Sequence, residues 1–435
     1  MMRRLLMVCI CGSIHLQAQE HNTITLEDAV TQAVKNNRQL EIARLEMEKA
    51  DAQVKEAYGY AMPSLSFGGT YTHTFKTPEI VFTVDTMVSR IKIGTENSYQ
   101  MGFNASQVLF NSVVFTGVGT AKIYQKASRE MYRASYNAAI ANVKRAFYNV
   151  LLARQVYETT KASMANAEEN FKNATILHEQ QIISDYDLIR SEVQVENIRP
   201  MVIESEQRVL VATNALKVQL GLNAEAMIAV KGSLDFAPVD SSLLDPSKAA
   251  VQNAGLKALN YQKQVTEELI AINRSEYMPT LSAFGNYQWT AQRNNLSVRG
   301  KDFVASSQAG ITLSINLFSG MQTVARIRQA IADKQKAQQQ INDTRETLKT
   351  QMQNVALRLE EAQKRIAGQS RTVELAEKSY KIAKTRYNTG SGTQLELNDA
   401  DLSLMRARLN RIQAIYDYSI AKTDLEELIS YHNPK

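Results

Sequence analysis

The sequence predicts a mainly α-helical protein with a smaller β part, and three observations support this fold class. Apolar residues recur with heptad spacing over stretches too long for a compact domain. Shorter segments between these stretches alternate apolar and polar residues, as paired strands do. The same order of segments then occurs twice along the 435 residues. We therefore expect long coiled-coil helices and a β-hairpin in each half of the chain.

The N-terminal residues 1–18 have the organisation of a secretory signal peptide. A basic start at Arg3 and Arg4 precedes a short apolar run, which ends near the small residue Ala18. The run is too short to span a bilayer core of about 30 Å, so we expect cleavage after Ala18 or one residue later. Because Cys9 and Cys11 leave with this segment, the mature chain is expected to contain no disulfide and no thiolate metal site.

Charge and motif content argue against an enzyme and against a nucleic-acid-binding protein. A net charge of +6 is weak for a chain of 435 residues. The sequence contains no His/Glu metal spacing, no nucleophile elbow and no phosphate-binding loop, so we expect no catalytic residue, metal or cofactor. After the leader no stretch approaches about 20 apolar residues, and any membrane passage must therefore be made by strands.

An internal repeat divides the mature chain into residues 19–232 and residues 233–435. Met62-Pro63-Ser64-Leu65-Ser66 recurs as Met278-Pro279-Thr280-Leu281-Ser282. Each copy is predicted to contain a helix, a β-hairpin and a long helix pair, with Pro63 and Pro279 marking the strand starts.

Four segments have the period-two pattern of strands with one apolar face. Phe67 and Tyr71 alternate with small polar residues in the first segment, and Tyr287 and Trp289 alternate similarly in the second copy, where Phe284 interrupts the pattern. Strands of about ten residues with an uncharged polar face are typical of a transmembrane barrel wall, although a soluble half-buried sheet shows the same alternation. Residues 75–98 and 291–303 are expected to be the outward loops.

The helical segments have coiled-coil spacing. The clearest run comprises Ile341, Leu348, Met352, Val355, Leu359, Ala362, Ile366, Val373, Ala376, Tyr380, Ala383 and Tyr387. A helix of roughly 60 to 70 residues would be about 90 to 105 Å long at about 1.5 Å per residue. Each long helix is followed by a turn and a second helix, whose starts at Ser184–Asp187 and Thr393–Glu396 have capping-box spacing. Gly390 and Gly392 supply permissive backbone before the second of these starts.

Four membrane strands are too few to close a barrel, because the smallest transmembrane barrels have about eight. An open edge in lipid leaves N–H and C=O groups unpaired at several kcal/mol each. Oligomerisation follows from this cost, and two, three or four copies would each supply an even number of strands.

The doubled plan, the two proline-marked strand starts, and Tyr387-x-x-Gly390-x-x-Thr393 before the last helix resemble the TolC-like outer membrane efflux protein family. The resemblance implies a homotrimer with a twelve-strand barrel in the outer membrane and a helical barrel in the periplasm. It implies a passive exit duct for efflux or type I secretion, which docks to a periplasmic adaptor and an inner-membrane pump of the RND, ABC or MFS type. A periplasmic coiled-coil adaptor without a pore is the alternative function.

The same resemblance assigns roles to residues at the helix turns. It places Glu396 and Asp399 in an acidic ring at the closed periplasmic end of the pore; the alternative is that Glu396 is only the capping-box acid and Asp399 only a dipole partner in the first turn. It places adaptor docking at the two turns, which contain Ser184, Asp187, Tyr387, Gly390, Gly392 and Thr393. The chain departs from the family pattern at Gly392, where a basic residue is usual, and at Gln181, where the first copy lacks the glycine.

Overall fold

The computed structural model describes residues 22–84 and 87–434, so the predicted signal peptide, residues 1–18, lies outside the described part. The helices are α1 (Leu26–Asn36), α2 (Arg38–Gly59), α3 (Ser112–Glu179), α4 (Asp185–Gln219), α5 (Pro246–Gln252), α6 (Ala254–Ser275), α7 (Gln322–Asn388) and α8 (Gln394–Leu428). The strands are β1 (Asn22–Ile24), β2 (Ser64–His73), β3 (Glu79–Val84), β4 (Met87–Lys92), β5 (Asn97–Phe110), β6 (Ile228–Val230), β7 (Thr280–Arg293) and β8 (Val304–Ser314).

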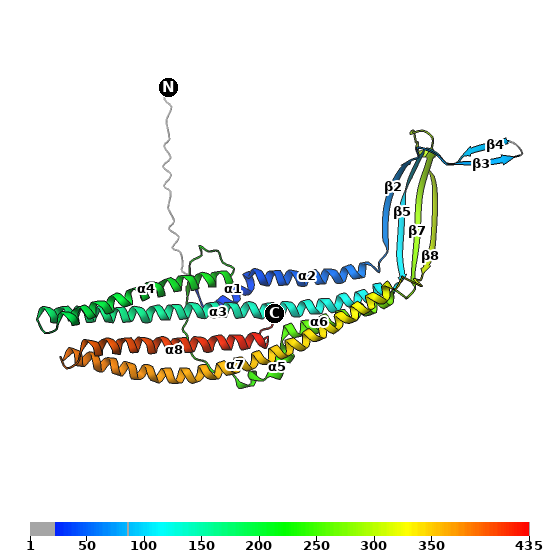
Figure 1. The fold of residues 1–435 in the computed structure, drawn as a ribbon. Coiled ribbons are helices and arrows are strands. Elements are labelled where there is room, and N and C mark those ends of the chain that lie inside the picture. Colours follow the sequence, from blue (N-terminus) through cyan, green and yellow to red (C-terminus); the bar gives the residue numbers. More distant parts are fainter. Residues whose placement is uncertain (1–21, 85–86, 435) are drawn as a thin grey trace, which may run out of the picture. The chain divides into compact units, whose positions relative to one another are not determined.

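The two halves of the chain have matching elements, which confirms the internal repeat (Figure 1). Helices α2 and α6 each have 22 residues and precede a strand pair, β2 with β5 and β7 with β8. The long helices α3 and α7 follow with 68 and 67 residues, and α4 and α8 have 35 residues each. The exact boundary of the repeats at residue 232 stays a prediction.

The chain divides into two compact units that do not coincide with the repeats. One unit, here called the turn unit, comprises the described residues up to 38 together with 137–244 and 353–427. The other, here called the strand unit, comprises 39–136, 245–352 and the residues from 428 onwards. Both repeats contribute to each unit, because α3 and α7 run from one unit into the other.

Four strands of the strand unit form one antiparallel sheet in the order β2-β5-β7-β8. Strands β2 and β7 begin directly after Pro63 and Pro279, as predicted, because proline has no N–H to donate to a ladder. The pairing of β5 with β7 joins the two repeats in a single sheet. Within the described residues, β2 and β8 each have one edge without a neighbouring strand.

One face of this sheet is apolar and rich in aromatic side chains, as the alternation predicts. The rings of Phe67 and Phe103 are 4.9 Å apart across β2 and β5, and Phe103 lies 6.3 Å from Trp289 on β7. Tyr287 packs edge-on against Trp289 at 4.8 Å. Ring pairs at these distances stabilise cross-strand contacts beyond their buried area.

The sheet register explains why Phe284 interrupts the alternation. Phe284 on β7 is paired with Gly310 on β8. A Cβ atom built on Gly310 would lie 2.9 Å from the Phe284 Cζ atom, so the ring occupies the space that a side chain at position 310 would need. Phe284 thus covers the exposed backbone of a glycine in the neighbouring strand, an arrangement that supports glycine within sheets.

The segment 75–98, expected to be a loop, contains additional regular structure. Strands β3 and β4 pair there as an antiparallel hairpin, with Ile80 opposite Ile91 and Val81 opposite Arg90. The second expected loop, residues 291–303, is partly occupied by β7, which continues to Arg293. The alternation of apolar and polar residues over 79–92 is weaker than in the four longer strands, and the sequence analysis therefore did not predict β3 and β4.

Most of the heptad positions predicted for α7 are buried, and the remaining four, Val373, Ala376, Tyr380 and Ala383, are half-buried. Ile341 and Leu348 of α7 pack with Leu256 of α6 in the strand unit. In the turn unit, Ala167 of α3 packs with Val195 and Ile198 of α4. None of the helices in the described residues is both long and apolar enough to cross a membrane.

Candidate functional site

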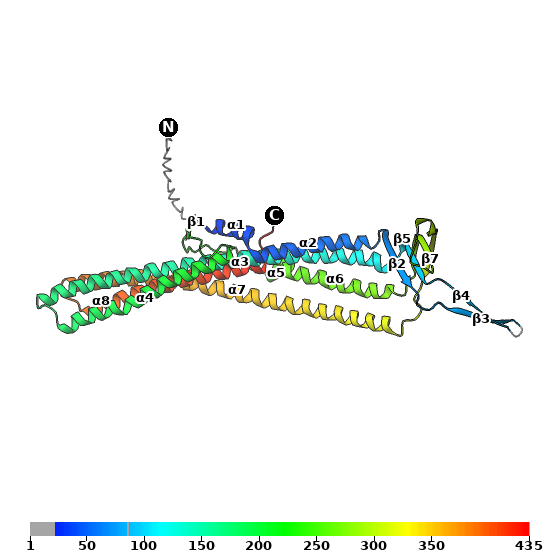
Figure 2. The ribbon, with the colours of Figure 1, turned by 90° about the horizontal axis from the view of Figure 1, so that it is seen from above.

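Both predicted helix turns belong to the turn unit and lie at the same end of its helices (Figure 2). Between α3 and α4, Ser184 caps the second helix, because its Oγ accepts the Asp187 N–H at 3.3 Å. The same Oγ donates to the Asp187 carboxylate at 2.8 Å. The backbone of Gln181 has φ 60°, the left-handed conformation that a glycine normally adopts at such a turn.

The turn between α7 and α8 uses both of its predicted glycines. Gly390 has φ 73°, and a Cβ atom on Gly392 would lie 2.9 Å from the Arg386 Cβ. Thr393 caps α8 by accepting the Glu396 N–H at 3.2 Å. The Glu396 carboxylate lies 3.7 Å from the Arg386 guanidinium, so Glu396 pairs with the preceding helix and Arg386 is a member of the site that the sequence did not indicate.

Glu396 and Asp399 line one groove between α7 and α8. The groove has a volume of about 420 Å³ and also contains Arg386, Ser379 and Ser403. Positions 396 and 399 are three apart, so both carboxylates lie on the same side of the helix. The two predicted acids are therefore brought together at an exposed surface, with one arginine beside them.

Tyr387 lies at the C-terminal end of α7, directly before the second turn, and is only 7% exposed. Burial raises the pKa of its hydroxyl, and the Asp187 carboxylate of α4 raises the pKa further. The hydroxyl has no hydrogen-bond partner among the described residues. Two predicted site residues from different repeats, Tyr387 and Asp187, are thus close enough to interact electrostatically.

The first two turns of α8 carry a buried polar stripe that the sequence analysis missed. Gln394, Asn398 and Asp401 are 2%, 9% and 3% exposed, and the Gln394 amide donates to Asn398 at 2.9 Å. Asp401 accepts hydrogen bonds from Ser163 and Asn166 of α3, both at 2.9 Å. Positions 394, 398 and 401 lie on one face of the helix, where a heptad pattern normally has apolar residues. Polar residues at these positions were the signal in the sequence that could have indicated a buried polar contact.

The buried carboxylate of Asp401 has an unusual environment. Burial raises its pKa above the ordinary value of 3.8, although the hydrogen bonds from Asn166 and Ser163 and the more distant charges of Arg408 and Lys384 oppose this shift. Burial also raises the pKa of Tyr380 to about 12, with the Asp401 and Glu169 carboxylates adding to the effect. Lys384 of α7 pairs with Glu169 of α3 at 3.0 Å beside this cluster.

Asp401→Asn is expected to flatten the pH dependence of stability and to stabilise the folded protein at neutral pH. A carboxyl whose folded-state pKa is raised contributes stability below its ordinary pKa of 3.8, and this stability is lost as the pH rises through the native value. The amide keeps an acceptor for Asn166 and carries no charge. Urea unfolding of the purified protein at pH 4 and pH 7, followed by circular dichroism, measures the difference.

Asp399→Asn is the matched control for this experiment, because Asp399 is exposed and lies two residues away. It should change the pH dependence little. A variant at Asp401 that is less stable than wild type at pH 7, with an unchanged pH slope, would show that the charged form is preferred.

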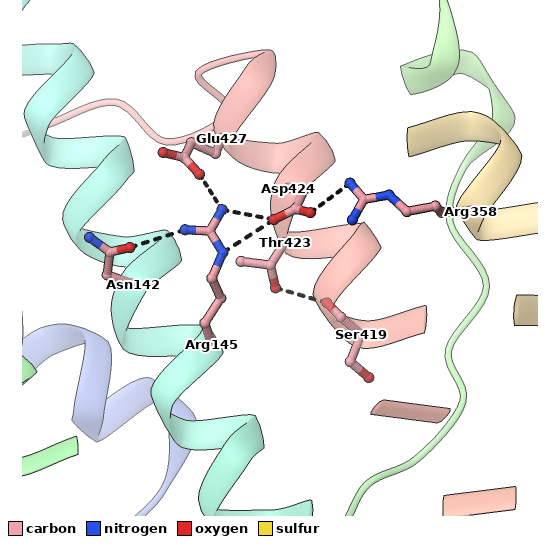
Figure 3. A network of polar contacts seen from close by, with 7 residues as sticks. All are labelled: Asn142, Arg145, Arg358, Ser419, Thr423, Asp424 and Glu427. Atoms are coloured by element: carbon pink, nitrogen blue, oxygen red, sulfur yellow. Dashed lines mark hydrogen bonds and ion pairs between the residues drawn. The ribbon is translucent and has the colours of Figure 1, made fainter. Parts of the chain in front are cut away.

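Beyond the turns, a charged network joins α8 to α3 and α7 (Figure 3). Arg145 of α3 donates to Asp424 at 2.7 Å and also to Glu427. Arg358 of α7 donates to the other oxygen of Asp424 at 2.8 Å. Acidic residues are unfavourable near a helix C-terminus, and here the neighbouring helices supply the compensating cations.

The described residues offer no group of three or more His, Cys, Asp or Glu side chains that could hold a metal ion. The polar features above are interhelical contacts, N-caps and one acidic groove. They can position helices relative to one another and set the local electrostatic potential, and they contain no paired nucleophile and base.

Comparison with known proteins gives a consistent result. The family model for "Outer membrane efflux protein" matches residues 29–222 and 246–430, one match in each repeat. Outer membrane protein TolC of Vibrio cholerae is 21% identical over 333 residues, which are 75% of this chain and 76% of that protein. Alkaline protease secretion protein AprF of Pseudomonas aeruginosa is 23% identical over 339 residues, 75% of this chain and 68% of that protein.

The solved structures agree on the fold. The CmeC outer membrane channel of Campylobacter jejuni has a TM-score of 0.77 at 17% identity, with coverage of 93% of this chain and 85% of that chain. The family model covers most of the chain and matches it twice, as the doubled architecture requires. The chain therefore belongs to the outer membrane efflux protein family, and it is an outer-membrane channel protein and not an enzyme.

Proposed function

We propose that the protein is the exit duct of a tripartite efflux or secretion system, and that it works as a homotrimer. The observation that carries this proposal is the four-stranded sheet, which has an apolar face, an uncharged polar face and two unpaired edges, β2 and β8, within the described residues. Unpaired edges are not tolerated in lipid, so β2 of one copy would pair with β8 of the next. Three copies would close twelve strands with the polar faces inward.

The proposed assembly places the helix turns at the periplasmic end. Adaptor docking is proposed for the surface around Ser184, Asp187, Tyr387, Gly390, Gly392 and Thr393, with an inner-membrane pump as the energy source. Exposed apolar side chains at the α3–α4 turn support a contact surface there, since Ile182 is 63% exposed and Tyr186 is 67% exposed. Membership of a channel family argues against the alternative of an adaptor without a pore.

The relatives differ in the kind of export for which they are named. One relative is named for secretion of an alkaline protease, and another, from Pseudomonas putida, is named for toluene efflux. Planar-bilayer conductance of the purified protein, with the oligomeric mass of the same sample, tests the proposal. Stepwise currents from a trimer would support it, whereas a non-conducting species that stays monomeric in detergent would overturn it.

We further propose that Glu396 and Asp399 line the narrow periplasmic end of the pore. Replacing both as Glu396→Gln and Asp399→Asn should reduce the cation-to-anion permeability ratio, because a carboxylate about 4 Å from an ion contributes about 1 kcal/mol in water, or roughly a factor of five. The reversal potential in a salt gradient measures the ratio.

Two further variants make this test specific. Arg386→Gln removes the cation beside Glu396 and should change the ratio in the opposite direction. Glu196→Gln alters an exposed acid on α4, which pairs with Arg199, and should have no effect. An unchanged ratio in the double variant would remove both acids from the pore.

A further inference from the structure

The polar face of the four-stranded sheet contains a single aromatic residue. In the described strands β2, β5, β7 and β8, this face carries Ser, Thr, Gly, Asn and Gln, two valines and no charged residue. Phe284 is the exception, and it belongs to the polar face because it pairs with Ser106 on one side and Gly310 on the other. A large apolar ring on an otherwise polar surface suggests a contact role.

The neighbours of Phe284 leave its ring accessible. The cross-strand row through Phe284 contains Ser64, Ser106 and Gly310, all of them small. The ring leans over Gly310, and a Cβ atom there would approach Cζ at 2.9 Å and Cε1 at 3.0 Å. Phe284 is nevertheless 41% exposed, so covering the glycine leaves part of the ring open to whatever occupies the polar side of the sheet.

We propose that Phe284 is a cargo contact site within the strand part of the duct, and that it favours organic cations with apolar substituents. This inference rests on the proposed function, because it requires the polar face to line the conduit. An aromatic face attracts a cation through its quadrupole and offers apolar area to the substituents, whereas the surrounding hydroxyl and amide groups offer neither. The uncharged surroundings leave this attraction without a competing ion pair.

The acidic groove at the helix turns adds charge complementarity for the same cargo class. If Glu396 and Asp399 line the entrance, cations are enriched there before they reach the strands. A free small cation would interact with the acids alone, whereas a cation with aromatic or alkyl groups would interact with both places. Phe284 therefore distinguishes cations of equal charge by their apolar surface.

The experiment uses the full-length oligomer in planar bilayers and two probe cations, tetraphenylphosphonium and tetramethylammonium. Tetraphenylphosphonium is expected to reduce the wild-type current at a lower concentration than tetramethylammonium. In Phe284→Ala its half-blocking concentration should rise by about two- to five-fold, the range expected for an exposed cation–π contact. Block by tetramethylammonium, which offers the ring less apolar area, should shift by a smaller factor.

Three variants distinguish a role of Phe284 in cargo contact from a purely structural role, in which its ring only covers Gly310. Phe284→Leu retains an apolar side chain over Gly310 and should lose the selectivity, whereas Phe284→Trp should restore or strengthen it. Gln288→Ala changes the same face four residues further along β7 and should resemble wild type. Equal block of wild type and Phe284→Ala by tetraphenylphosphonium, in channels that still conduct, would overturn this inference alone. Absence of conductance in the wild type would instead overturn the proposed function.

Discussion

A Gly102→Ala variant is expected to lose the pairing between β5 and β7, and with it the oligomer. A Cβ atom at position 102 would lie 2.5 Å from the Tyr287 carbonyl oxygen and 2.8 Å from the Gln288 Cα. Both are backbone atoms of the paired strand, so no side-chain rotation relieves the clash and the ladder itself must move. We expect a destabilisation on the order of 2–3 kcal/mol, at the upper end for overpacking.

The single tryptophan makes this variant straightforward to measure. Trp289 lies on β7, next to the clash, and is the only tryptophan in the chain. Its fluorescence during urea unfolding reports on the sheet, and the yield of detergent-extracted oligomer reports on assembly.

Gly68→Ala is the matched control for this prediction. Gly68 pairs with Gly102 across β2 and β5, and a Cβ atom there would meet nothing within 4 Å. Alanine should be neutral or slightly stabilising at this position, because glycine costs about 0.5–1 kcal/mol within a strand. Similar unfolding of both variants would contradict the steric argument.

Asp424→Ala is expected to weaken the contact of α8 with its two neighbours in the turn unit. Asp424 accepts from Arg145 and from Arg358, so its removal leaves Arg358 without this partner and Arg145 with only Glu427 and Asn142 (Figure 3). Asp424 is 18% exposed but Arg358 is 53% exposed, so solvent screens part of the interaction. We expect a loss of about 1–2 kcal/mol, below the cost of breaking a fully buried pair.

Glu360→Ala provides the comparison for Asp424→Ala. Glu360 pairs with Lys364 on the same helix, and both side chains are well exposed at 62% and 75%. Its removal should change the stability little, because solvent screens an exposed pair. Urea unfolding of the two variants at low and high salt tests the ranking, which would be contradicted if both lost stability equally.

Features that depend on local periodicity were predictable. The buried positions of α7, such as Ile341, Leu348 and Val355, follow from three-four spacing, because the helix itself places them on one face. Pro63 and Pro279 mark strand starts because each lacks an N–H. The positions of Ser184 and Thr393 as N-caps follow from the hydroxyl placed before each helix.

Features that depend on a distant partner were not predictable. The sequence shows Asp401 only as an acidic residue within the last predicted helix. Its carboxyl is buried and hydrogen-bonded because the fold brings Ser163 and Asn166 of α3 next to it. Arg386 became part of the acidic groove because the turn between α7 and α8 brings it to Glu396. Phe284 had no explanation until the register placed Gly310 beside it.

The sequence by itself determined the doubled plan, the periodic elements and the family resemblance, because each depends on residue order along one chain. The tertiary structure decided which polar residues are buried, which charges are paired and which ring covers which glycine. These properties depend on the pairing of strands and helices that are far apart along the chain, by 279 positions in the case of Arg145 and Asp424. Local propensities contain no information on such distances, since long-range pairing arises only when the whole fold forms.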